Sequence, residues 1–112
     1  MKAGDIRLSP LSQADGQIKT RPVLLLHSAP PFGDFIACGL STQLQHEVAG
    51  FDEIIGPDDE DFATARLRQP SLIRLAFLGS VPLRQLRGRV GSISENRLNR
   101  LLPKLADFLR PR

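Results

Sequence analysis

Apolar residues occur as short runs, separated by turn formers, over most of this 112-residue chain. Residues 4–8, 22–28, 35–40 and 51–55 are such runs, bounded by proline, glycine, serine or aspartate, which is typical of β-strands. No run is followed by a helical pattern long enough for a parallel crossover, so antiparallel pairing is expected. The sequence therefore predicts a mainly β domain of five to seven short strands.

The same turn-forming residues indicate the loops that connect the strands. The polar stretch 9–20 predicts a long mobile loop, and residues 56–62 an acidic, solvated turn. Residues 63–79 predict two strands around a break at Gln69-Pro70. In the second, Leu72, Arg74 and Ala76 share one face and Ile73, Leu75 and Phe77 the other, which indicates a half-buried strand. Residues 82–88 predict a short helical turn, followed by one brief strand.

The C-terminal segment is the one clear helix. Ser94 is a suitable N-cap, Glu95 suits the first turn and Arg110 the last. Pro103 lies inside this helix and is expected to kink it. Apolar residues recur at helical spacing and form one stripe: Leu98, Leu101, Leu102, Leu105, Phe108 and Leu109. Such a stripe must be buried, so the helix is expected to pack on the sheet of a small barrel or half-barrel.

Length and composition exclude several classes of protein. A chain of 112 residues fits one domain, taken as residues 1–112. Cys38 is the one cysteine and stands in an apolar run, which indicates a core residue. There is no zinc spacing, P-loop or dinucleotide fingerprint, and we expect no cofactor and no metal. With no signal peptide and no long apolar stretch, a soluble cytoplasmic protein is expected.

Charge is distributed unevenly along the chain. The net charge is +3, and more than half of the basic residues, all of them arginines, lie between Arg66 and Arg100. This permits a phosphate-rich partner, although a solvated arginine surface explains it equally well. Residues 47–61 are acidic instead. Because Trp and Tyr are absent, a base-stacking platform like that of single-strand-binding proteins is not expected.

Few residues are suited to chemistry. The cluster at residues 58–61 lacks EF-hand spacing, so a solvated turn explains it better than a cation site. His27 ends an apolar run and His46 lies in a polar segment; an imidazole can act as a general base, but neither has a nucleophile signature beside it. Arg21 precedes Pro22, which favours an extended, stiff backbone there. If strands 22–28 and 35–40 pair antiparallel, Arg21 and Ser41 meet at one rim of the sheet.

Three segments together resemble the MazF/PemK family of toxin endoribonucleases. "GDI" at 4–6 is similar to the family's opening strand, and "RPVLLL" at 21–26 to its Arg-Pro-Val-Leu-Val-Leu stretch. "IACGLSTQLQ" at 36–45 resembles the strand that ends in Thr or Ser followed shortly by Gln. Weaker likeness extends over 70–81 and 91–109, so the resemblance covers nearly the whole chain in order.

The resemblance implies a small SH3-like barrel of the CcdB/PemK type, usually a homodimer. It also implies metal-independent cleavage of single-stranded RNA by 2′-OH attack, and inhibition by a cognate antitoxin protein. Carried over by position, Arg21 and Ser41 are the catalytic residues. Arg21 would clamp the phosphate or act as general acid or base. Substrate contacts are assigned to Thr42, Gln43, Lys19 and Arg74.

Departures from the family pattern keep other functions open. His27 replaces a residue that is usually polar, and Gly39-Leu40 replaces Pro or Ala followed by an aliphatic residue. A glycine inside a strand predicts a bend or a close approach by a neighbouring group. The acidic stretch 46–63 would repel RNA if it covered the groove. The alternatives are a CcdB-like gyrase poison, which acts through C-terminal residues, and a binding module that has lost activity.

Overall fold

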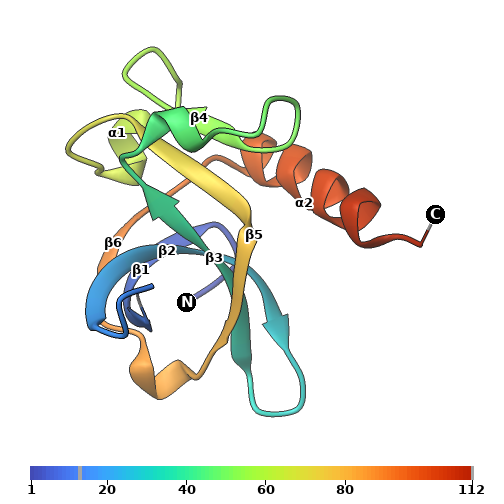
Figure 1. Ribbon diagram of the computed structural model, residues 1–112. Helices are drawn as coiled ribbons and strands as arrows, with labels where there is room; N and C mark the ends of the chain where they lie inside the picture. Colours follow the sequence, from blue (N-terminus) through green and yellow to red (C-terminus); the bar gives the residue numbers. More distant parts are fainter. Residues whose placement is uncertain (13, 112) are drawn as a thin grey trace.

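The computed structural model describes residues 1–12 and 14–111 of the chain. Strands dominate the first ninety residues, and a single long helix follows them (Figure 1). In chain order the elements are β1 Asp5–Ser12, β2 Ile18–Ala29, β3 Asp34–Ser41, the 3-10 turn η1 Leu44–His46, β4 Glu53–Ile55, α1 Phe62–Ala65, β5 Ser71–Val81, the 3-10 turn η2 Leu83–Gln85, β6 Arg89–Ser92 and α2 Glu95–Leu109.

The six strands form one antiparallel sheet in the order β4-β5-β3-β2-β1-β6. The strands β2, β3 and β5 are strongly bent, and α2 lies along one side of the sheet (Figure 1). The predicted mainly β architecture with a C-terminal helix on the sheet is thus confirmed. As paired, the sheet is open, with β4 and β6 at its edges.

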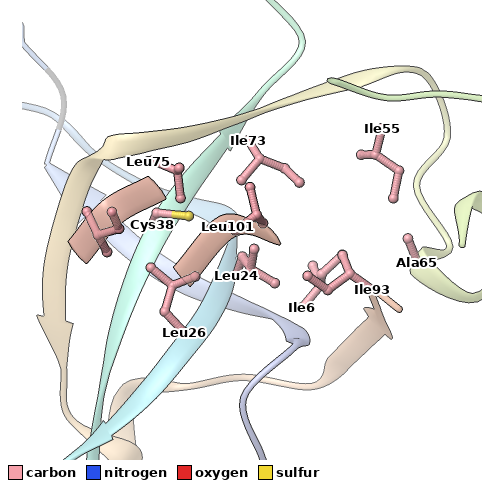
Figure 2. Packing of buried hydrophobic residues seen from close by; sticks show 11 residues of the cluster. Ile6, Leu24, Leu26, Cys38, Ile55, Ala65, Ile73, Leu75, Ile93 and Leu101 are labelled. Carbon is pink, nitrogen blue, oxygen red and sulfur yellow. The ribbon is translucent and has the colours of Figure 1, made fainter. Parts of the chain in front are cut away.

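The unbroken apolar run of β2 is explained by burial on both faces of the sheet. Leu24 and Leu26 belong to the larger core cluster, which includes Leu101 of α2 (Figure 2). Val23 and Leu25 point to the opposite face and belong to a second cluster with Phe35. Because both faces are covered, alternation of apolar and polar residues disappears from the middle of the strand.

The C-terminal helix α2 begins as its sequence predicts. The Ser94 hydroxyl accepts a hydrogen bond from the Arg97 backbone N–H at 3.1 Å, and Leu101 is fully buried. The apolar stripe is buried only in its first part, and Phe108 near its end is 55% exposed. The ring of Phe108 contacts the ring of Phe51, with 4.7 Å between the centroids. No helix in the described residues has the length and apolarity that a membrane crossing requires.

The predicted mobile loop at 9–20 was wrong for most of its length. The strand β1 extends to Ser12 and β2 begins at Ile18, and these two residues pair. Gln13, which falls in this segment, lies outside the described residues. The polar side chains misled the prediction because an exposed hairpin arm needs no apolar pattern when backbone pairing satisfies its N–H and C=O groups.

The prediction of a first strand in the early part of 63–79 was also wrong. Residues 62–65 form the helical turn α1, which ends at Arg66 with φ 55°, and an irregular segment follows to Pro70. The turn packs against β6 so closely that a Cβ at Gly91 would collide with the Ala65 carbonyl oxygen. The second strand is β5, but both Leu72 and Ile73 are buried there, so its start is covered on two faces rather than one.

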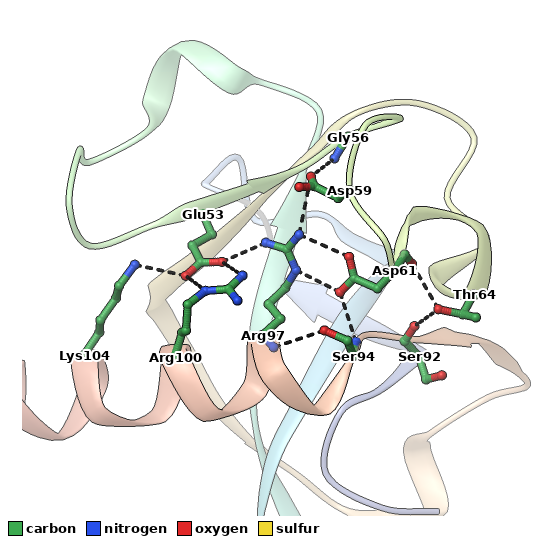
Figure 3. A network of polar contacts seen from close by, with 10 residues as sticks. All are labelled: Glu53, Gly56, Asp59, Asp61, Thr64, Ser92, Ser94, Arg97, Arg100 and Lys104. Carbon is green, nitrogen blue, oxygen red and sulfur yellow. Dashed lines mark hydrogen bonds and ion pairs between the residues drawn. The ribbon is translucent and has the colours of Figure 1, made fainter.

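The acidic turn is exposed at residues 57–60, as expected, but its end is not solvated, because Asp61 is only 2% exposed. It is held to α2 by Arg97, whose side chain is only 4% exposed (Figure 3). The Arg97 guanidinium donates two hydrogen bonds to Asp61, at 2.9 and 3.1 Å, and one to Glu53 at 2.7 Å. Asp59 completes the cluster at 3.4 Å. Burial is the largest single effect and opposes ionisation of Asp61. The hydrogen bonds from Arg97 and from the Ser94 backbone, together with the charge of Arg97, outweigh it and lower the pKa of this carboxyl.

Cys38 lies in the core, as its apolar surroundings predict. It is 1% exposed and belongs to the larger cluster (Figure 2). Burial, with a smaller contribution from the charge of Asp52, raises the pKa of the Cys38 thiol to about 12. The thiol is therefore protonated at neutral pH and unsuited to nucleophilic chemistry.

Candidate active site

A cavity of about 340 Å³ opens at one end of the sheet, where β2 enters the core and β3 leaves it. Apolar residues fill the buried middle of both strands, and polar residues stand at this end, Arg21 on β2 and Ser41 on β3. The cavity is lined by Leu11, Arg21, Pro22, Leu40, Ser41, Thr42, Gln43, His46, Ser71, Arg74 and Phe77. Five of the six residues assigned to the site from the sequence are among them.

The strand register brings Arg21 and Ser41 to one place. In the antiparallel pair β2–β3, Val23 lies opposite Gly39. The same register, continued by two residues, places Arg21 opposite Ser41. Both residues then share the face of Val23, because side chains two apart in a strand point the same way. Antiparallel pairing of these two strands predicts this proximity of Arg21 and Ser41 at one rim of the sheet.

Arg21 presents an uncompensated positive charge to the cavity. It is exposed, and its backbone pairs with Ser9 of β1. Within the described part of the chain, neither Arg21 nor Arg74 forms an ion pair with a carboxylate. A guanidinium offers five N–H donors in a planar fork that fits a phosphate. Neither guanidinium group is paired with a carboxylate of the described residues, so both are available to a negatively charged ligand.

The hydroxyl of Ser41 is held by the backbone that follows it. The Gln43 backbone N–H donates a hydrogen bond to the Ser41 oxygen at 3.0 Å. A serine hydroxyl has one hydrogen to donate and two lone pairs to accept with. This bond uses a lone pair, so the hydroxyl hydrogen stays available for an oxygen of a bound ligand.

Thr42 and Gln43 extend the polar side of the cavity. Thr42 is exposed, and its carbonyl oxygen accepts a hydrogen bond from Leu44 at 3.1 Å, which starts the turn η1. The Gln43 side-chain carbonyl accepts a hydrogen bond from the Gln45 amide at 2.8 Å. Both side chains thus stand at the exit of β3, beside Ser41, with hydrogen-bonding groups suited to sugar, base or phosphate.

The chain matches one protein-family model over nearly its whole length. The family model described as "PemK-like, MazF-like toxin of type II toxin-antitoxin system" matches residues 2–109. The chain belongs to this toxin family. A comparison with curated protein sequences gives no significant match.

Solved structures share the fold of this PemK/MazF-like toxin. The Mycobacterium tuberculosis toxin MazF-mt6 superposes with a TM-score of 0.66 at 19% identity, covering 92% of this chain and 93% of the other. A structure named "Endoribonuclease in complex with its cognate antitoxin from Mycobacterial species" gives 0.69 at 15% identity, covering 100% and 99%. At this level of identity the likeness establishes the fold.

Lys19 is the one assigned residue that does not line the cavity. It is exposed on β2, two residues before Arg21, so both side chains point to the same face of the hairpin. Its partner across the β1–β2 pair is Leu11, which does line the cavity. Lys19 is therefore placed to extend the basic surface beyond the cavity rather than to act inside it.

Sequence reasoning assigned no role in the site to His46 and Phe77, which both line the cavity. His46 is the last residue of η1, and its polar neighbours gave no reason to place it near Arg21. Phe77 was expected on the face of its strand that carries Ile73 and Leu75; these two residues are buried, but Phe77 is 40% exposed. By contrast, His27 is exposed on β2 and is not a lining residue; its Nδ1 lies 2.7 Å from the Ser28 carbonyl oxygen.

The carboxylates of the acidic stretch do not line the cavity. Among the described residues that line it there is no carboxylate, whereas Arg21 and Arg74 are both present. Glu53 is turned towards α2 instead, where Lys104 and Arg100 donate hydrogen bonds to it at 3.0 and 3.1 Å (Figure 3). The repulsion of RNA considered from the sequence would therefore have to come from carboxylates outside the lining of the cavity.

Proposed function

We propose that this toxin is an endoribonuclease that cleaves single-stranded RNA without a metal ion. The observation that carries the proposal is that Arg21 and the Ser41 hydroxyl line the same cavity. Among the described residues, Arg21 has no ion-pair partner and no carboxylate lines this cavity. A phosphodiester supplies the negative charge and the oxygen acceptors that this arrangement lacks.

The reaction that fits these groups is internal transfer at phosphorus. The ribose 2′-oxygen forms a bond to the adjacent phosphorus and the bond to the 5′-oxygen breaks, which yields a 2′,3′-cyclic phosphate and a 5′-hydroxyl. Charge accumulates on the non-bridging oxygens as the new bond forms. Arg21, held by the stiff Arg-Pro backbone, and Ser41 would donate hydrogen bonds to those oxygens, and fixed donors of this kind need little reorganisation.

The 2′-hydroxyl must also lose a proton. A guanidinium stays protonated at neutral pH, so Arg21 suits the role of charge clamp better than that of base. Histidine is the side chain whose charge changes between about pH 5 and 8. His46, which lines the cavity, is therefore our candidate for the group that takes the proton. The departing 5′-oxygen then receives a proton from solvent.

The proposed base leads to a prediction for the cleavage rate. Replacing His46 with glutamine is expected to lower the rate by roughly 100-fold, because an amide cannot take up the proton of the 2′-hydroxyl. Single-turnover rates of the two proteins measure the effect. The matched control is His27→Gln, because His27 does not line the cavity. An unchanged cleavage rate in the His46 variant would contradict the assignment.

A protein partner is proposed as well. The structural neighbour described above was solved in complex with its cognate antitoxin. We infer that this chain likewise has a cognate antitoxin, and that two copies of the chain associate as the family resemblance implies. The antitoxin would inhibit cleavage by occupying the groove that leads to Arg21.

The proposed activity is tested with purified protein and a long single-stranded RNA in EDTA. We expect discrete fragments that end in a cyclic phosphate, and no cleavage at a position where the attacking 2′-hydroxyl is replaced by hydrogen. RNA left intact by correctly folded protein would reject the nuclease. The CcdB-like gyrase poison and the inactive binding module would then be the functions to test, the first by gyrase inhibition.

A further inference from the structure

Phe77 places an exposed aromatic ring on the cavity that Arg21 and Ser41 line, in a chain with no Trp and no Tyr. It lies where β5 is irregular: Gly39 of β3 pairs with Arg74, but Cys38 pairs with Leu78, so three residues of β5 have no counterpart. Phe77 is the last of these three. The irregularity turns its ring out of the core, which leaves it 40% exposed.

Gly39 makes this ring position possible. A Cβ built on Gly39 would lie 2.8 Å from Cδ2 and 3.2 Å from Cε2 of Phe77, closer than side chains tolerate. Any residue other than glycine would push the ring away from β3. The departure from the family pattern noted at Gly39 is thus the feature that seats an aromatic ring against the strand that ends in Ser41.

Arg74 completes the surface. Its guanidinium carbon lies 5.4 Å from the centroid of the Phe77 ring, within the range of a cation–π contact. Nucleobases stack on aromatic rings and on guanidinium planes, and each such contact tolerates any base. The partly exposed ring and the guanidinium that lies over it therefore offer an aromatic and cationic surface on the same cavity as Arg21 and Ser41.

We propose that Phe77 and Arg74 form a stacking subsite for one nucleobase of single-stranded RNA, next to the phosphate held by Arg21. The inference rests on the proposed function and adds to it the group that binds a base. It differs from the platform excluded by composition, which needs several aromatic residues, because one ring positioned by Gly39 is sufficient for one base.

The absence of Trp makes the subsite directly observable. In Phe77→Trp the new indole is the sole fluorophore of its kind, and a base that stacks on it is expected to quench it. The probes are four short homopolymeric deoxyoligonucleotides, one for each base, which lack the attacking 2′-hydroxyl and cannot be cleaved. We expect saturable quenching by at least one of them, and none by an oligomer of abasic sugar phosphates of equal length.

A matched control separates stacking in the cavity from quenching that the oligonucleotides cause at any exposed tryptophan. Phe32→Trp places the same fluorophore in the turn between β2 and β3, where Phe32 is 82% exposed and does not line the cavity. Quenching of equal size at both positions, or quenching by the abasic oligomer, would overturn the subsite. So would a fluorescence change in the Phe77→Trp variant that depends on protein concentration alone, since the indole would then face a second copy of the chain.

A second variant covers the case in which tryptophan does not fit beside Gly39. Phe77→Leu keeps an apolar side chain but loses the ring, and Phe77→Tyr keeps it. The anisotropy of a labelled deoxyoligonucleotide should show about tenfold weaker binding for the leucine variant and recovery with tyrosine. Equal binding by wild type and Phe77→Leu would reject the subsite. Stacking without RNA cleavage would instead retain the subsite and reject the nuclease.

Discussion

Replacing Arg21 with alanine is expected to reduce RNA cleavage by about a thousandfold and to leave the protein folded. The guanidinium is the group proposed to meet the charge that develops at phosphorus, and the loss of one such fixed donor typically costs about 10²–10³ in rate. Because Arg21 is exposed and has no ion-pair partner among the described residues, its removal should change the free energy of unfolding by less than about 0.5 kcal/mol. Single-turnover cleavage in EDTA and a thermal melt measure the two quantities.

Two further variants define what Arg21 contributes. Arg21→Lys retains the charge but not the planar fork, so we expect partial activity, between that of wild type and alanine. Arg84→Ala makes the same change in net charge at an exposed position of η2 that does not line the cavity, and it should cleave like wild type. If Arg84→Ala were as inactive as Arg21→Ala, total charge rather than a placed guanidinium would explain the loss. Undiminished cleavage by Arg21→Ala would remove the mechanism.

The proximity of Arg21 and Ser41 could be predicted because it depends only on how two neighbouring strands pair. Two apolar runs joined by a short turn pair antiparallel, and the start of one strand then faces the end of the other. The close approach at Gly39 was also predictable, since a glycine inside a strand leaves space for a neighbour. The identity of that neighbour was not, because Phe77 reaches it only through the irregular pairing of β5 with β3.

Other features depend on partners that are distant in sequence. His46 enters the cavity because η1 folds back after β3, and no local pattern specifies that path. Arg97 reads as a polar residue of α2, yet it is buried because Asp61, thirty-six positions earlier, accepts two of its hydrogen bonds. Charged residues far apart in the sequence carry no periodic signal, so the ion cluster could not be expected from the pattern that identified the helix.

Replacing Arg97 with methionine is expected to lower the free energy of unfolding by about 3–5 kcal/mol. Methionine fills much of the same volume but leaves Asp61, whose side chain is 2% exposed, without its charged partner. An uncompensated buried charge carries a penalty of this size. For a domain of this length the melting temperature should fall by roughly 12 °C or more. Arg100→Met removes a contact of Glu53 from the exposed side of the same helix, and should cost less than about 1 kcal/mol.

The same cluster should make stability depend on pH in the acid range. Burial is the largest single effect on Glu53 and opposes its ionisation. The hydrogen bonds and the charges of Arg100 and Lys104 together outweigh it, so the pKa of Glu53, like that of Asp61, is lowered. A lowered carboxyl pKa stabilises the folded state above the unfolded value, near pH 4, and this contribution is lost as pH falls through the folded pKa. In Arg97→Met, burial of Asp61 is no longer offset, so protonation relieves the penalty.

The stability difference between wild type and Arg97→Met should therefore be largest at neutral pH and shrink as the pH falls towards and through about 4. Urea unfolding at several pH values measures it. A second substitution, Asp61→Asn, placed in the methionine variant, removes the stranded charge and should restore part of the lost stability at neutral pH. Stability curves that stay parallel from neutral to acid pH, with no recovery in the double variant, would mean that Arg97 stabilises α2 by packing rather than by its charge.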